Sequence, residues 1–363
     1  MVWPRTHVED GNISHSVWAL RKLLQRPDYP DPIQTVPRRG YLFAADVRPR
    51  LREIHAGQEL RAREIPRPLP LIGRGHESTI LMAKLKSARA SSGSVILMEG
   101  DAGTGKTRMG EDLMREARRQ GFTTLTGRSH CEGGAPPYAA FAEILEDYAR
   151  ATPRAGWLRS VGEAGPELAC LMPELRRRFP EPAPPDTVPA GTRRAHLLNA
   201  YRSFLTRVCR AKPVLILLEN LHCADDSTLW LFRHLTLGIA SLRCVVYVTY
   251  RGRERASAPY FAETLSQLAR IGGVSRIQLR NLSRAAVRDV LSAVNGEFAP
   301  PALALLVFQL TAGNPFLIEE ILVLLNSEGR LFNSAGGWTS TAGPDWVDLP
   351  PAIRARLDGA QTR

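Results

Sequence analysis

The strongest chemical signal in the chain is the segment 100–107, which reads Gly-Asp-Ala-Gly-Thr-Gly-Lys-Thr. It fits the pattern GxxxxGK followed by Thr, in which glycines let successive backbone amides turn toward phosphate oxygens. The lysine, Lys106, brings a positive charge to the β- and γ-phosphates, and Thr107 places its hydroxyl on Mg²⁺. The residues assigned to nucleotide phosphates are Gly100, Gly103, Thr104, Gly105, Lys106 and Thr107.

A strand before this motif and a helix after it would position these groups. Residues 94–99 are short and apolar, as in a buried strand, and residues 106–119 have a helical pattern. The helix would then direct its N-terminus at the phosphates. A chance match is expected in roughly one per hundred chains of this length. The strand and the helix favour the functional interpretation over chance.

Two later strand ends supply the polar groups that such a site also needs. Residues 214–218 are apolar and lead into Glu219, and residues 244–250 lead into Arg251. An acid at a strand end can hold the Mg²⁺ that Thr107 touches, although alone it would more often mark a plain core strand. Glu219 and Arg251 are therefore the candidate catalytic residues, and Thr107 and Glu219 the candidate metal ligands. For Arg251, a γ-phosphate sensor and a surface salt bridge both remain open.

Length and composition indicate a folded chain of one large domain or two to three small ones. The 363 residues are 44% hydrophobic, which is ample for a globular core. No apolar run approaches the ~18 residues of a membrane helix, and the first residues lack the apolar core of a signal peptide. We therefore expect a cytoplasmic protein without a membrane partner.

Charge and cysteine content give weaker indications. The formal net charge of +12 favours polyanionic partners such as nucleic acid, but the charge is spread along the chain. The five cysteines are scattered and include no CxxC pair, so we expect neither a disulfide framework nor a zinc cage. His130–Cys131 and His222–Cys223 are accordingly interpreted as incidental pairs, with metal ligation as the less favoured alternative.

Composition and periodicity divide the chain into four parts. Residues 1–46 are self-contained in pattern, and the Arg- and Pro-rich residues 47–69 are typical of a linker. Strand and helix patterns alternate over residues 70–297, which predicts a parallel α/β sheet. Residues 298–363 are expected to form a helical segment and a truncated C-terminal extension.

Residues 70–360 resemble the STAND branch of AAA-like P-loop ATPases, as found in large bacterial transcriptional regulators. Four elements follow the family's order: Leu-Ile-Gly-Arg at 71–74, the phosphate motif, the strand ending in Glu219 with its Leu-His-x-Ala-Asp tail, and Thr-Tyr-Arg at 249–251. Gly-Asn-Pro-Phe at 313–316, with Glu319 and Glu320, completes the resemblance. It implies ATP and Mg²⁺ as ligands. It also places Ile72 and Gly73 beside the adenine and Pro315 against the base.

One departure from the family's pattern bears on hydrolysis. The family usually carries a second acid after the strand, which polarises the attacking water, whereas this chain has Asn220. An amide cannot accept the proton. The resemblance therefore implies ATP binding with slow hydrolysis. Cys223 also replaces the family's usual Trp, and Gly75 stands where an acid usually follows Arg74.

Residues 2–46 resemble the last half of an OmpR/PhoB-type winged helix-turn-helix domain. One apolar stripe at helical spacing is formed by Ile13, Val17, Leu20 and Leu24, and residues 33–43 fit the hairpin of the wing. The resemblance implies a helix in the major groove and wing arginines at phosphates or the minor groove. The candidate DNA-binding residues are Asn12, His15, Ser16, Arg21, Lys22, Arg38 and Arg39. A merely solvated polar face is the alternative.

The strands and first helix that lead this domain have no counterpart here, so we expect weak, largely electrostatic DNA binding. The predicted fold is α/β, with a P-loop NTPase parallel sheet, a helical extension and an incomplete N-terminal winged helix. The predicted function is an ATP-binding transcriptional regulator that switches conformation with nucleotide, binds DNA and forms a nucleotide-dependent homo-oligomer. Two alternatives stay open: a P-loop ATPase with turnover independent of DNA, and a truncated remnant without function.

Overall fold

The computed structural model describes residues 33–36, 40–43, 65–131, 136–172, 175, 189–252, 258–333 and 336–339. The chain divides into two compact units, Met1–Arg61 and Ala62–Arg363. In the first unit, strands β1 (Ile33–Val36) and β2 (Gly40–Phe43) pair antiparallel, with Ile33 opposite Phe43. The predicted hairpin is thus confirmed. The candidate DNA-binding residues all lie outside the described residues, so the winged helix stays a prediction.

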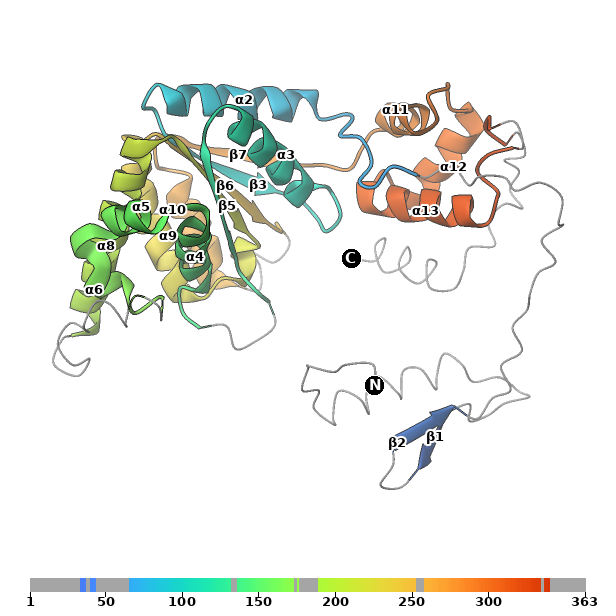
Figure 1. The fold of residues 1–363 in the computed structure, drawn as a ribbon. Coiled ribbons are helices and arrows are strands. Elements are labelled where there is room, and N and C mark those ends of the chain that lie inside the picture. The colour runs from blue at the N-terminus through green and yellow to red at the C-terminus, as the bar shows by residue number, and fades with distance from the viewer. Residues whose placement is uncertain are drawn as a thin grey trace. The chain divides into compact units, whose positions relative to one another are not determined.

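The second unit contains a five-stranded parallel sheet in the order β4-β5-β6-β3-β7 (Figure 1). Its strands are β3 (Ser94–Glu99), β4 (Thr123–Arg128), β5 (Val214–Glu219), β6 (Cys244–Tyr250) and β7 (Val274–Gln278). The parallel sheet confirms the predicted α/β fold class. Because the strands run in one direction, the loops after β3, β5 and β6 emerge at one edge, where open α/β sheets bind ligands.

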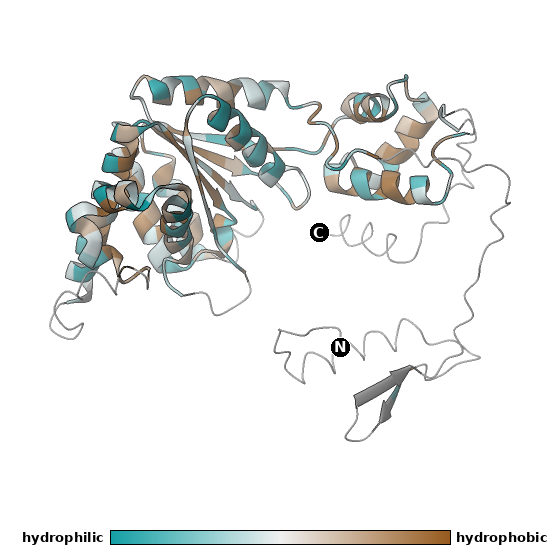
Figure 2. Ribbon diagram, viewed as in Figure 1, coloured by the Kyte–Doolittle hydropathy of each residue, from teal (hydrophilic) through white to brown (hydrophobic). Residues whose placement is uncertain are grey.

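Helices cover both faces of this sheet because alternate strand residues point to opposite sides. On β3, Val95 and Leu97 belong to one buried cluster, whereas Ile96 and Met98 belong to another. Figure 2 shows the apolar strands in brown between helices that carry teal polar residues. The first cluster is covered by α4 (Ala139–Ala151), α5 (Arg154–Val161), α6 (Gly165–Leu168), α8 (Ala190–Ala211), α9 (Asp226–Ile239) and α10 (Pro259–Leu268), with the short turns η1 (Gly162–Ala164) and η3 (Leu221–Cys223). The second is covered by α2 (Gly75–Arg89) and α3 (Lys106–Arg119).

A smaller helical lobe follows the sheet and has its own core. It comprises α11 (Arg284–Asn295), α12 (Pro301–Thr311) and α13 (Pro315–Ser327). Side-chain oxygens cap two of these helices: Ser283 accepts from the amide of Ala286, and Asn314 accepts from the amides of Phe316 and Leu317. Ile65, Leu69 and Ile72 pack against the same core, so the segment before α2 connects this lobe to the sheet.

Cys131 and Cys223 form a disulfide, so the prediction that the cysteines form no disulfide framework is wrong for this pair. They are 92 residues apart in sequence, yet their Cα atoms lie 4.7 Å apart. Strands β4 and β5 pair with Arg128 opposite Glu219, which brings together the segments that follow them. Cysteine number and CxxC spacing carry no information about such lateral pairing.

None of the helices in the described part of the chain has the length and apolar character needed to span a membrane.

Candidate functional site

A cavity of about 430 Å³ opens beside the loop of residues 100–105, which we call the P-loop. Its walls come from residues 68–72, the P-loop with the first turn of α3, the residues after β5 and β6, and the first turns of α13. Both the sheet and the helical lobe therefore contribute. The volume falls in the range typical of sites for small ligands.

Most of the residues predicted to bind nucleotide meet in this cavity. Its lining includes Ile72, Gly103, Thr104, Gly105, Lys106, Thr107, Arg251 and Pro315. Gly73, Gly100 and Glu219 are the described candidates that do not line it. Gly73 instead permits close packing, since its φ is +73° and a Cβ there would lie 2.7 Å from the Cβ of Ala286. A Cβ on Gly100 would lie 2.7 Å from the Leu279 carbonyl oxygen. The lack of a side chain therefore lets the chain after β3 pass close to the chain after β7.

The P-loop has the backbone and charge of an anion site. Gly103 and Gly105 have φ angles of +77° and +96°, a conformation that L side chains rarely adopt. The buried Lys106 donates from Nζ to the carbonyl oxygens of Gly100 at 2.8 Å and Asp101 at 2.7 Å. No side chain caps the N-terminus of α3, and its first turn has no acid. Its amide dipoles are therefore available to phosphate oxygens.

The start of α13 contacts the P-loop directly. Asn314 donates from Nδ2 to the carbonyl oxygen of Ala102 at 2.9 Å, and the amide of Phe316 donates to the carbonyl oxygen of Gly103 at 3.2 Å. A Cβ on Gly103 would lie 2.5 Å from Asn314 Oδ1, so only glycine permits this approach. The helical lobe and the P-loop are thus joined at the place where a ligand would bind.

Arg74 is a cavity residue that the sequence prediction did not assign to the site. It is 6% exposed, and its Nη2 donates to the carbonyl oxygen of Thr104 at 2.9 Å. Burial lowers the pKa of this guanidinium, and Glu77, 3.7 Å away, opposes the shift. A buried cation in the cavity wall therefore holds the P-loop backbone at Thr104. Its position after Gly73 in the Leu-Ile-Gly-Arg segment was the available signal.

Glu219 faces a neighbouring strand in this structure. Its Oε2 accepts from Arg128 Nε at 2.6 Å, and this hydrogen bond raises the pKa of Arg128. Glu219 is 6% exposed, whereas half of the Arg128 side chain is exposed. The carboxylate is thus held by a partner that can move into solvent. Its assignment as a metal ligand and catalytic residue remains a prediction.

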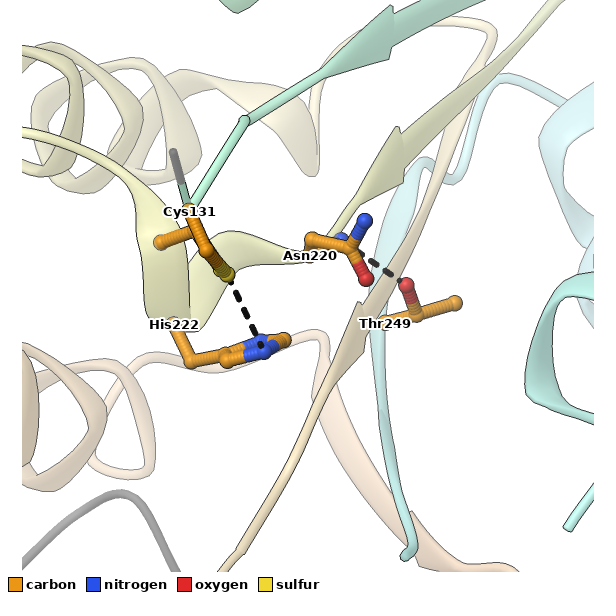
Figure 3. The surroundings of a disulfide bond; sticks show 5 residues. Cys131, Asn220, His222 and Thr249 are labelled. Atoms are coloured by element: carbon orange, nitrogen blue, oxygen red, sulfur yellow. Dashed lines mark hydrogen bonds between the residues drawn. A yellow bond between two sulfur atoms is a disulfide. The ribbon is translucent and has the colours of Figure 1, made fainter. Parts of the chain in front are cut away.

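Asn220, the next residue, turns the chain toward the cavity. Its φ of +56° lies in the left-handed region, which asparagine tolerates better than most residues. Its amide donates to the Thr249 hydroxyl oxygen at 3.0 Å, which links the end of β5 to β6 (Figure 3). Asn220 lines the cavity and is exposed there. The side chain that follows the acidic end of β5 in the cavity is therefore an amide and not a carboxylate.

Residues 70–246 match the family model described as AAA ATPase domain. The match spans the P-loop and agrees with the parallel sheet of this chain. An uncharacterized protein of Rhizobium meliloti (strain 1021) is 26% identical over 274 residues. The match covers 69% of this chain and 25% of that protein, so the chain spans about a quarter of the relative's length.

Three solved structures are similar to this chain at low TM-scores. A STAND protein with a tetratricopeptide repeat sensor from Pyrococcus horikoshii has a TM-score of 0.39 at 13% identity, over 69% of this chain and 30% of that one. Drosophila ORC bound to DNA has a TM-score of 0.47 at 14% identity, over 94% and 75%. AMPPCP-bound DnaA from Aquifex aeolicus has a TM-score of 0.40 at 14% identity, over 71% and 62%. At these TM-scores the likenesses carry no argument for fold or function.

Proposed function

We propose that this chain is an ATP-binding conformational switch within a transcriptional regulator. The observation that supports it is the direct contact of α13 with the P-loop, made by Asn314 and Phe316, at a cavity to which both lobes contribute. A nucleotide there would touch both lobes. Since only ATP carries a γ-phosphate, ATP and ADP would favour different positions of α13 on the loop.

The residues around the cavity fit a magnesium nucleotide. Lys106 would exchange its two carbonyl partners for phosphate oxygens, and the uncapped start of α3 would receive another. Thr107 and Glu219 are the residues that would hold Mg²⁺, which when bound neutralises phosphate charge. Glu219 would do so through water or after Arg128 withdraws into solvent.

Slow hydrolysis suits such a switch. A general base or water-positioning acid is expected after the acidic strand end, and Asn220 occupies that place in the cavity. The ATP-bound conformation would then not be ended quickly by hydrolysis. The position of the helical lobe would depend on whether ATP or ADP is bound. Assembly into a homo-oligomer with ATP is part of this proposal.

DNA binding through the N-terminal part completes the proposal. Its support is the sequence pattern of residues 2–46 and the hairpin β1–β2. Arg38 and Arg39 lie between these two strands in sequence, where they would meet phosphates.

Calorimetric titration with ATP and ADP, with and without Mg²⁺, tests the nucleotide switch. We expect binding that depends on Mg²⁺ and is lost in Lys106→Ala. The matched control is Lys86→Ala, which removes an exposed lysine of α2 outside the cavity. Retained affinity in Lys106→Ala would overturn the site, and steady DNA-independent turnover would favour the enzyme alternative.

Fluorescence anisotropy with duplex DNA tests the second part of the proposal. Weak binding that falls steeply with salt and is reduced by Arg38→Ala and Arg39→Ala is expected. Affinity that does not respond to these substitutions would reject the wing as a DNA contact.

A further inference from the structure

Three potential metal-binding side chains gather beyond the nucleotide cavity, at the ends of β4 and β5. Cys131 follows β4, and His222 and Cys223 belong to the turn η3 after β5. Their donor atoms all lie within 4.8 Å of one another. Cys131 Sγ is 4.0 Å from Nε2 of His222 (Figure 3). Among the described residues, these three are the histidine, cysteine or acidic side chains that lie close enough together to bind one ion.

The backbone holds these donors in place without any ligand. The amide of Ser129 donates to the carbonyl oxygen of Glu219 at 3.0 Å, which continues the β4–β5 pairing toward Cys131. In the turn, the amide of Cys223 donates to the carbonyl oxygen of Asn220 at 2.8 Å. The amide of Asn220 in turn donates to Thr249 on β6. Both halves of the cluster are therefore fixed to the sheet.

The donor set selects a particular class of ion. Two thiolates and one imidazole suit borderline-soft divalent cations, above all Zn²⁺, and leave a fourth position for water or another ligand. Thiolates do not suit Mg²⁺ or Ca²⁺, which prefer oxygen ligands. Cys131 is exposed, so an ion can reach the cluster from solvent. The charges also balance, because two thiolates neutralise one divalent cation.

We propose that Cys131, His222 and Cys223 form a Zn²⁺ site in the reduced protein. The Cys131–Cys223 disulfide is the oxidised state of this site, in which the two sulfurs cannot bind the ion. A dithiol reductant gives two electrons and two protons to the disulfide, which becomes two thiols while the reductant becomes a disulfide. Zn²⁺ then binds the two sulfurs and Nε2 of His222, and the two thiol protons pass to solvent. This site is separate from the proposed nucleotide site and needs no nucleotide.

A cobalt titration tests the proposal, because Co²⁺ occupies zinc sites and absorbs light when thiolates bind it. The full chain is reduced with a dithiol and freed of reductant without oxygen, and a denatured aliquot is checked for five titratable thiols, because Cys209 and Cys244 are buried in the folded chain. One Co²⁺ per chain with thiolate-to-cobalt absorption is expected, and Zn²⁺ should abolish that absorption. Protein that keeps the disulfide should give none. Fully reduced protein without the absorption would overturn the proposal.

Single substitutions locate the ion. Cys131→Ser and His222→Gln should each weaken Co²⁺ binding by more than about 100-fold, since even second-shell partners contribute 10- to 100-fold. Matched controls are Cys170→Ser and His196→Gln, which change exposed residues outside the cluster and should bind Co²⁺ as wild type does. Thermal unfolding confirms that each variant is folded. Equal weakening in variants and controls, or in neither, would show that the ion binds elsewhere.

Discussion

The nucleotide cavity and the Cys131–His222–Cys223 cluster lie near one another along the same sheet edge but differ in what they can bind and what they can move. The cavity offers Lys106 and the uncapped start of α3, which attract anionic phosphates, and both lobes form its walls. The cluster offers thiols and an imidazole, which attract a cation, and only the sheet lobe holds it. A ligand in the cavity can therefore change how the two lobes contact one another, whereas an ion in the cluster joins the segment after β4 to the turn η3 within one lobe.

The two sites meet at Asn220. This residue lines the cavity, and its carbonyl oxygen accepts the hydrogen bond that closes the turn containing His222 and Cys223. An influence of the metal on the nucleotide can therefore pass through Asn220. We expect that influence to be small beside the effect of nucleotide contacts themselves.

The largest expected effect separates the two sites. Lys106→Ala should weaken Mg-ATP binding at least about 100-fold, or about 2.7 kcal/mol, because it removes the positive charge that the motif supplies to the β- and γ-phosphates. Its Co²⁺ absorption after reduction should match wild type. Calorimetry and cobalt titration of the same preparation measure both. Parallel loss at the two sites would mean that they are not independent.

A gain of activity is expected at the shared residue. Asn220→Asp restores an acid after the acidic strand end and keeps a side chain that tolerates the observed φ of +56°. ATP turnover should rise about tenfold or more, since a positioned base contributes at least that much. Phosphate release measures the rate, and Lys106→Ala/Asn220→Asp should be inactive. An unchanged rate would refute the view that the amide limits hydrolysis.

A more moderate loss is expected from the buried support of the P-loop. Arg74→Ala removes the hydrogen bond to the carbonyl oxygen of Thr104 and should weaken ATP binding about tenfold, or about 1.4 kcal/mol. The exposed Arg89 on α2 provides the matched control, Arg89→Ala. Calorimetry compares the two variants. Similar affinities in both would leave Arg74 with a purely structural role.

The smallest effect distinguishes the lobe contact from simple helix capping. Asn314→Ala and Ser283→Ala each remove a helix cap and should lower the free energy of unfolding by about 1 kcal/mol. Only Asn314 also bonds the P-loop, so only its loss should change the ratio of ATP to ADP affinity. Denaturant unfolding and calorimetry measure the two quantities. A changed ratio in Ser283→Ala as well would argue against a direct contact signal.

The P-loop and its setting follow from the order of residues alone. The strand Ser94–Glu99 and the helix Lys106–Arg119 were predicted with the bounds that the structure has. These features are local. Consecutive backbone groups bind phosphate, and the hydrophobic pattern of a strand or helix is contained in residues that are close in sequence. The acidic strand end, Arg251 and Pro315 were found for a related reason, because each belongs to a short motif of its own.

Which strand ends lie beside one another depends on the folding of the whole sheet. The order β4-β5-β6-β3-β7 places Arg128 against Glu219 and Cys131 against Cys223, although each pair is about 90 residues apart in sequence. The packing of the helical lobe likewise decided that Asn314 reaches the P-loop. The order of the strands and the packing of the helical lobe depend on the apolar surface that entire sheet and helix faces bury against one another. No short segment of sequence contains that information.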